Sequence, residues 1–149
     1  MRNLTIMIMI ICLLGCKKDN TQLSVPTSDE CNLSSLEKQV FGKWYLDSVQ
    51  FWQTGAQAIT QTPSNNSAMA GNYMDNQLGV ECQKNQETMS SGSKYDGSWG
   101  IDYRNGIALF MGNSYSGYIR EVNSKSLVLR TDTSAYTNQI DGRVIFYHR

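Results

Sequence analysis

The sequence predicts an all-β protein: an up-and-down antiparallel β-barrel of about eight strands with a short N-terminal helix. Apolar residues alternate with polar ones over several short stretches, most clearly in residues 98–104 and 107–112. Turn-forming glycine and asparagine residues separate these stretches at short, regular intervals. Short connections favour a meander of neighbouring strands, and closing the meander into a barrel removes exposed edges that would promote aggregation.

The first fifteen residues are typical of a bacterial signal peptide. Arg2 gives a positive start, about a dozen apolar residues follow, and small Gly15 stands just before Cys16. The apolar run is too short to cross a bilayer, which takes about 20 residues. With Leu13 three positions before Cys16, the segment resembles the lipobox of Gram-negative bacterial lipoproteins. We expect cleavage before Cys16 and lipidation of that cysteine; an ordinary cleaved signal or an uncleaved anchor is the alternative.

The expected anchor divides the chain into a signal peptide (1–15), a lipidated cysteine with a flexible tether (16–30), and a barrel domain (31–149). The resemblance implies a triacylated, palmitate-bearing Cys16, and two or more acyl chains anchor a protein stably because each buried CH₂ contributes about 0.8 kcal/mol. The polar tether follows no helical or strand period and is expected to span about 20 Å. Lysines rather than aspartate follow Cys16. By analogy with lipoprotein sorting, this implies the outer membrane, on its periplasmic or surface-exposed face.

Charge and cysteine content narrow the function further. The chain has 13 basic and 13 acidic residues, so no nucleic-acid partner is expected, because nucleic-acid recognition usually needs a basic face. Cys12 leaves with the signal peptide and Cys16 is lipidated, so Cys31 and Cys82 remain in an oxidising compartment, which predicts one disulfide. The bridge would close a loop of about 50 residues and stabilise the fold by about 4 kcal/mol. Two free buried thiols are the alternative.

A short helix is predicted between residues 32 and 40, where apolar residues recur at spacings of three and four. Ser34 and Glu37 form a capping box at its start, and Gly42 suits the left-handed turn past its end. Residues 43–52 then form a strand rich in aromatic and β-branched residues. Simple alternation places Trp44 and Leu46 on one face of this strand and Tyr45, Val49 and Phe51 on the other.

The helix running into Gly42-x-Trp44 resembles the G-x-W opening of lipocalins, and more closely the small lipocalin-like domains of bacterial lipoproteins. A later Trp99-x-Ile101 strand and two hairpins are similar to the same family. The resemblance covers about residues 33–149, and the middle third matches poorly.

This resemblance implies a lipocalin-like barrel in which Gly42 and Trp44 begin the first strand. It implies that Trp44 plugs the closed end of the barrel. It also implies that an arginine of the last strand stacks on this tryptophan, and both Arg143 and Arg149 are available.

Residues 53–93 have the weakest pattern, being rich in small and polar residues. A structureless segment of this length is unusual in a compact domain, so two or three strands are expected, near 71–81 and 82–90. The remaining strands are predicted at 98–104, 107–112, 115–122, 127–132 and 143–148.

The hairpin between the strands at 98–104 and 107–112 has two alternative registers. A two-residue Asn105-Gly106 turn pairs Tyr103 with Ala108 and mixes apolar and polar side chains on one face. A three-residue loop with Gly106 in a G1 bulge pairs Tyr103 with Ile107 and keeps the apolar side chains together. We therefore expect the three-residue loop.

The chain is not expected to be an enzyme or to hold a metal or cofactor. The one histidine, His148, follows the alternation of the last strand and suits a packing or rim position. No Ser-His-Asp arrangement can be built around it. Cys31, Cys82 and His148 lack the closely spaced ligand pairs of zinc sites. The run from Gly112 to Gly117 lacks the lysine and the helix of a phosphate loop.

Aromatic and apolar residues of the central strands are the candidate ligand-binding residues. They either fill the core or line a pocket for an apolar or amphipathic molecule, as lipocalin interiors do. The candidates are Trp99, Ile101, Tyr103, Leu109 and Met111. Arg120 points inward if Val122 pairs with Leu127, and a buried arginine needs a protein carboxylate or an anionic ligand as partner.

Two functions are consistent with this pattern. The first is a lipid-anchored envelope protein whose barrel holds a small hydrophobic ligand. The second is a structural or interaction module with a solid barrel, which binds another envelope protein or a glycan through its loops. An enzyme is the third and least supported class.

Overall fold

The computed structural model describes residues 27, 29–52, 57–90, 93–112, 116–132 and 142–149. The expected signal peptide, the lipidation site Cys16 and most of the expected tether lie outside these residues. None of the helices within the described ranges has the length and apolarity that crossing a membrane requires.

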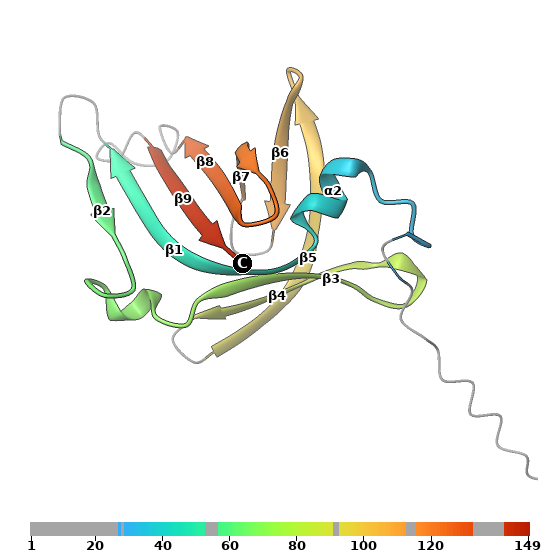
Figure 1. The fold of residues 1–149 in the computed structure, drawn as a ribbon, viewed down its shortest axis with the longest axis horizontal. Coiled ribbons are helices and arrows are strands. Elements are labelled where there is room, and N and C mark those ends of the chain that lie inside the picture. The colour runs from blue at the N-terminus through green and yellow to red at the C-terminus, as the bar shows by residue number, and fades with distance from the viewer. Residues whose placement is uncertain (1–26, 28, 53–56, 91–92, 113–115, 133–141) are drawn as a thin grey trace, which may run out of the picture.

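The chain forms a closed antiparallel β-barrel with one short α-helix (Figure 1), which confirms the predicted all-β, up-and-down fold. Nine strands form one sheet, and pairing of the first strand in the chain with the last strand in the chain closes the barrel. The elements are α2 (Ser35–Val40), β1 (Gly42–Trp52), β2 (Ile59–Gln61), the 3₁₀ turn η1 (Ser67–Met69), β3 (Tyr73–Leu78), the 3₁₀ turn η2 (Val80–Cys82), β4 (Lys84–Ser90), β5 (Ser93–Arg104), β6 (Ile107–Gly112), β7 (Ser116–Val122), β8 (Ser126–Asp132) and β9 (Gly142–His148).

Strand β2 is an addition to the eight-stranded barrel; two or three strands were expected in this part of the chain, but the position of this one was not predicted. It pairs with Val49–Phe51, while β3 pairs with Gly42–Tyr45 on the same edge of β1. The two strands therefore act as one interrupted strand. Alternation could not reveal β2, because its only large apolar residue, Ile59, is exposed. The expected strands in the middle of the chain correspond to β3 and β4.

A β-bulge in β1 corrects the predicted faces of this strand. Leu46 pairs with Tyr147 and Ser48 pairs with Phe146, so Asp47 is an extra residue without a partner on β9. The extra residue shifts the alternation by one position. Val49 therefore joins Trp44 and Leu46 inside the barrel instead of facing outward with Tyr45.

The hairpin between β5 and β6 has the two-residue turn, so the predicted three-residue loop is wrong. Tyr103 pairs with Ala108 and Ile101 pairs with Phe110. Asn105 and Gly106 have φ angles of 53° and 77°, the left-handed values that Asn-Gly hairpin turns require. Turn chemistry thus outweighs the apolar alternation of β6.

The interior of the barrel is packed with side chains from nearly all strands. Nine residues are essentially fully buried: Trp44, Phe110, Met74, Leu127, Leu129, Ile145, Gln86, Val40 and Asn76. A side chain added to Gly112 would lie within 3 Å of Gln86 and Phe110, so the interior leaves no room there. The described core residues thus pack closely against one another, as protein interiors do.

Candidate functional site

The residues predicted to line one pocket lie on two faces of the barrel wall. Trp99 and Ile101 pack in or against the core, and the indole Nε1 of Trp99 donates a 2.9 Å hydrogen bond to the Gln77 carbonyl. Tyr103 is 61% exposed. The observed register of β5 and β6 turns Leu109 and Met111 outward, so these five residues do not form one site.

Arg120 also lies outside the barrel, which corrects its predicted inward position. Val122 does pair with Leu127, as the prediction assumed, but Ile119 pairs with Leu129 and Glu121 with Val128. Arg120 is the extra residue of this second bulge, and its side chain is exposed. The bulge changes the face because it adds one residue to the two-residue period of the strand.

The end of the barrel beside α2, which we call the closed end, holds a buried polar network. The carbonyl oxygen of Val40, the last residue of α2, accepts hydrogen bonds from Trp44 Nε1 at 2.9 Å and from Asn76 Nδ2 at 2.7 Å. Asn76 Oδ1 accepts from Gln86 Nε2 at 3.1 Å. These bonds fix the end of the helix to two strands, since buried polar groups are costly unless they are paired.

Arg149 completes this closed end. Its guanidinium carbon lies 4.0 Å from the ring centroid of Trp44, and its Nη2 donates to the carbonyls of Gln39 and Phe41. Burial lowers the pKa of Arg149. Of the two arginines that the lipocalin resemblance offered, Arg149 and not Arg143 therefore stacks on the tryptophan; Arg143 donates from Nε to Thr131 at 3.0 Å.

An ion pair holds α2 from its other end. Lys84 of β4 contacts the carboxylate of Glu37, and Lys84 Nζ also lies 5.5 Å from the centroid of the Trp99 ring. Burial raises the pKa of Glu37, but hydrogen bonds from Lys84 and from the backbone and hydroxyl of Ser34 outweigh it and lower the pKa overall. The Ser34–Glu37 pair is the predicted capping box, which the structure confirms.

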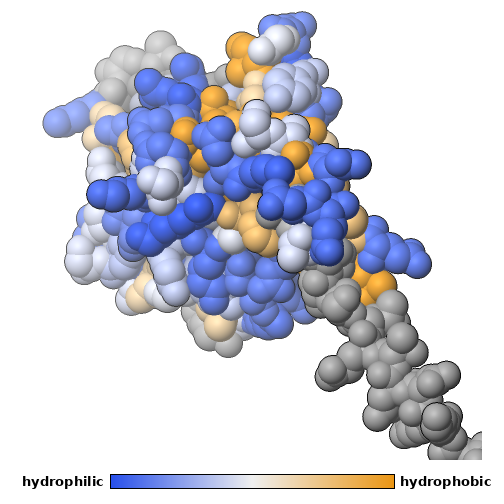
Figure 2. Space-filling model, turned by 45° about the vertical axis from the view of Figure 1, so that its right-hand side comes forward, coloured by the Kyte–Doolittle hydropathy of each residue, from blue (hydrophilic) through white to orange (hydrophobic). Residues whose placement is uncertain are grey.

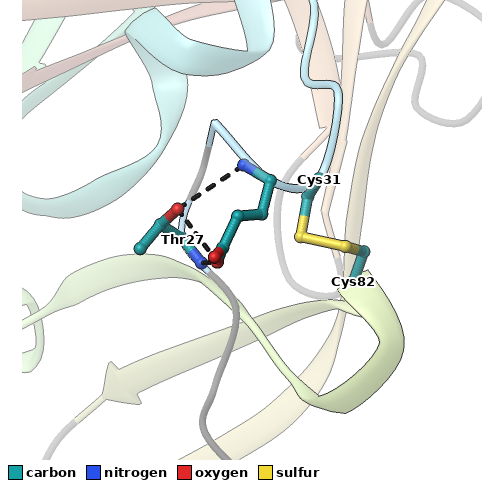
Figure 3. Close-up of a disulfide and its surroundings, with 4 residues drawn as sticks. Thr27, Cys31 and Cys82 are labelled. Carbon is teal, nitrogen blue, oxygen red and sulfur yellow. Dashed lines mark hydrogen bonds between the residues drawn. A yellow bond between two sulfur atoms is a disulfide. The ribbon is translucent and has the colours of Figure 1, made fainter.

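The segment before α2 is fastened to the same end (Figure 3). Cys31 and Cys82 form the predicted disulfide, which joins this segment to the turn between β3 and β4. The backbone N–H of Cys31 donates to the Thr27 carbonyl at 3.3 Å, and the Thr27 hydroxyl donates to Glu30 at 3.1 Å. The end of the expected tether is therefore a structured turn, and Asp29 forms an ion pair with Lys38 of the helix.

The outer surface of the barrel carries a different kind of site. Paired residues share a face of the sheet, and one row of pairs crosses five strands. The row is Leu109, Tyr118, Arg130, Val144 and Gln50. Gln50 lies between two residues that pack in or against the core, so the row faces outward. Leu109 and Val144 are nevertheless only 8% and 4% exposed and stand apart from the core cluster.

Two cavities lie over this row, and together we call them the outer groove. The first has a volume of about 390 Å³ and is lined by Arg104, Leu109, Met111, Ser116, Gly117, Tyr118, Arg130 and Thr131. The second has a volume of about 250 Å³ and is lined by Gln50, Trp52, Ala58, Arg120, Arg130 and Val144. Arg130 belongs to both, and its guanidinium carbon lies 5.4 Å from the Trp52 ring centroid.

Sequence reasoning missed most of this groove. It singled out Arg120, Leu109 and Met111, but as inward-facing residues. Arg104 and Arg130 gave no signal, because isolated arginines in exposed strands are ordinary. The position of Arg130 becomes apparent from its pairing with Val144 and Tyr118, and that of Arg104 from the lining of the first cavity.

The rest of the described surface has few groups that could take part in catalysis, metal binding or apolar contacts. His148 is exposed, lies 3.5 Å from the Asp47 carboxylate and stacks on Tyr45 with a 5.9 Å centroid separation. No group of three metal-binding side chains occurs among the described residues. Figure 2 shows a mostly hydrophilic surface with scattered apolar patches. The exposed large apolar residues are Tyr45, Ile59, Val80, Tyr95, Tyr103, Ile107 and Met111, spread over several elements.

Comparisons with protein-family models, curated proteins and solved structures give no match for this chain.

Proposed function

We propose that this protein is a non-catalytic, lipid-anchored module of the Gram-negative cell envelope that binds its partner on the outer surface of a solid barrel. The anchor follows from the lipobox-like segment ending at Cys16. The lipocalin-like opening and the stacking of Arg149 on Trp44 support kinship with the lipocalin-like domains of bacterial lipoproteins.

The observation that carries this proposal is the packing of the described core residues. Trp44, Phe110, Leu129 and Ile145 are fully buried, and the amides of Asn76 and Gln86 are bonded to protein groups within the same core. A carrier of apolar molecules needs an enclosed apolar cavity that buries most of its ligand. The residues expected to line such a cavity lie instead on opposite faces of the wall, which favours surface binding over an internal hydrophobic ligand.

The positions of the two ends agree with an anchored module. Thr27, the described residue nearest to Cys16 in sequence, lies beside the disulfide at the closed end. The groove residues Trp52, Arg130 and Val144 lie near the other ends of their strands, where β1 and β8 finish and β9 begins (Figure 1). These three groove residues therefore lie away from the end at which the tether joins the barrel.

Two measurements on the full chain, produced in a Gram-negative host, test the proposal. Metabolic labelling with an alkyne analogue of palmitate is expected to label the wild type and Cys12→Ala, and to fail for Cys16→Ala. An unlabelled wild type that retains its first fifteen residues would overturn the anchor. Native mass spectrometry of the purified protein is expected to give the mass of the acylated chain alone. A stoichiometric apolar adduct would instead support an internal ligand.

A further inference from the structure

We propose that the outer groove binds an acidic saccharide, a short run of sugars that carries carboxylate or sulfate groups. This inference rests on the proposed function, because it names the partner class for surface binding. The observations that carry it are the charge of the groove, the position of Arg120 and the combination of aromatic, apolar and amide groups beside it.

The groove concentrates positive charge in a protein whose overall charge is balanced. Arg104, Arg120 and Arg130 line its two cavities, and no carboxylate is among the described lining residues of either. The whole chain has 13 basic and 13 acidic residues, so this separation of charge is local. A concave surface with one sign of charge attracts ligands of the opposite sign.

Two described carboxylates that neighbour the groove arginines in the sequence are already engaged. Asp102 lies 3.6 Å from Arg104 Nε and accepts a hydrogen bond from the Tyr103 backbone. Glu121, next to Arg120, accepts hydrogen bonds from the Asn123 amide and the Ser126 hydroxyl at 2.8 and 2.9 Å. Within the described chain, Arg120 therefore keeps its guanidinium available to an anion.

A polar cavity on the β3–β4–β5 side provides an internal contrast. Its volume is about 310 Å³, and Lys94 stands there with two acidic neighbours, Glu87 and Asp96. Lys94 contacts Glu87 directly and lies 3.8 Å from Asp96. Positive charge in that cavity is compensated by the protein, whereas no described carboxylate lines the cavity that contains Arg120.

The bulge explains how Arg120 reaches the groove. Ile119 and Val122 both pack against the core, so two residues between them, Arg120 and Glu121, stand opposite the single residue Val128. Without the extra residue, Arg120 would alternate with Glu121 and share the inward face of Val122. Bulges are frequent beside binding sites because they redirect one side chain without disturbing the rest of the strand.

The groups beside the arginines match a sugar better than an acyl chain. Trp52 and Tyr118 offer aromatic surface, and the nearly buried Val144 and Leu109 form an apolar floor. A pyranose ring presents apolar C–H groups on its faces and hydroxyls at its edge, for which the amide of Gln50 is a partner. Guanidinium groups bind carboxylate and sulfate oxygens through paired hydrogen bonds. Each cavity is open to solvent, which suits a polar ligand.

Binding to a matched set of oligosaccharides tests the inference. The probes are tetragalacturonate and a chondroitin sulfate tetrasaccharide, with methyl-esterified tetragalacturonate and desulfated, carboxyl-reduced chondroitin as neutral counterparts. Isothermal titration calorimetry on the full-length acylated protein in detergent is expected to give at least tenfold tighter binding for an acidic probe than for its neutral counterpart. Raising the salt concentration is expected to weaken the acidic complex only.

Four variants locate the binding. Arg120→Gln and Trp52→Leu are expected to weaken the acidic probe at least tenfold, while Lys125→Gln, which removes an exposed positive charge outside the groove, leaves it unchanged. Circular dichroism checks that each variant is folded. Arg120→Glu repeats the test with reversed charge and is expected to abolish binding.

Each contrary outcome has a distinct meaning. Equal binding of acidic and neutral probes, undiminished binding by Arg120→Gln, or no binding to any probe would overturn the saccharide site. Binding of polyglutamate peptide but of none of the sugars would also overturn it, in favour of an acidic protein partner. These results leave the proposed function standing, because the acyl label and the native mass of the protein without an apolar adduct decide that question separately.

Discussion

The closed end of the barrel and the outer groove use the same residue type in opposite ways. At the closed end, Arg149 stacks on Trp44 and donates to the carbonyls of Gln39 and Phe41, so the protein itself supplies its partners. In the groove, Arg120 stands in a β-bulge and faces solvent. The comparison teaches that polar groups satisfied within the protein maintain the fold, whereas polar groups left accessible on a rigid wall are available for binding.

Replacing Trp44 with alanine is expected to give the largest effect. The change removes a fully buried ring and leaves the Val40 carbonyl with one hydrogen bond fewer. Such truncations cost about 3–5 kcal/mol in the free energy of unfolding. Urea denaturation followed by circular dichroism measures the loss. Trp52→Ala, at the half-buried groove tryptophan, is the matched control with a smaller loss; equal losses would contradict the distinction between the two regions.

Removing the disulfide with Cys31→Ala and Cys82→Ala is expected to cost about 2–4 kcal/mol, because the bridge restricts the unfolded chain. It also frees the turn at Thr27 from the β3–β4 connection. Thermal unfolding of the double variant, compared with the oxidised and reduced wild type, measures this effect. An oxidised wild type no more stable than the double variant would contradict a structural role for the bridge.

The sequence predicted the regular parts of this barrel but not the positions where one residue changes the register. Alternation located most strands, and the local chemistry of Ser34, Glu37 and Gly42 defined the helix ends. The bulges at Asp47 and Arg120 were invisible, because an extra residue reverses the faces of a strand without altering its composition. Leu109 and Met111 were misplaced for a related reason: apolar alternation in β6 was given more weight than the Asn105-Gly106 turn.

The buried amides were also beyond prediction. Asn76 and Gln86 lie in polar stretches that look solvent-facing, and only the three-dimensional pairing with the Val40 carbonyl explains their burial. Asn76→Ala is expected to cost about 1–3 kcal/mol, because the Gln86 amide loses its acceptor. Urea denaturation measures this change. Asn85→Ala, on the exposed side of β4, is the control, and a comparable loss there would contradict the role of the network.

The ion pair between Glu37 and Lys84 predicts a pH-dependent effect. The pKa of Glu37 is below its usual value near 4.5, so the ionised form stabilises the fold above that pH, and the contribution is lost as pH falls through the lowered value. Glu37→Gln is expected to reduce stability by about 1 kcal/mol at pH 7 and by less at pH 3. Urea denaturation at both pH values measures the difference, and a constant difference would contradict the linkage.

The smallest effect on stability is expected from Arg120→Gln, the variant that matters most for saccharide binding. Arg120 is exposed and contributes no described hydrogen bond or ion pair to the fold, so the free energy of unfolding should change by less than about 0.5 kcal/mol. Arg149→Gln provides the contrast, because it leaves two carbonyls and the Trp44 ring without their partner. Urea denaturation of both variants measures the difference. If Arg120→Gln proved as destabilising as Arg149→Gln, the groove arginine would be a structural residue. The distinction between arginines that are paired within the protein and arginines that are accessible for binding would then be wrong.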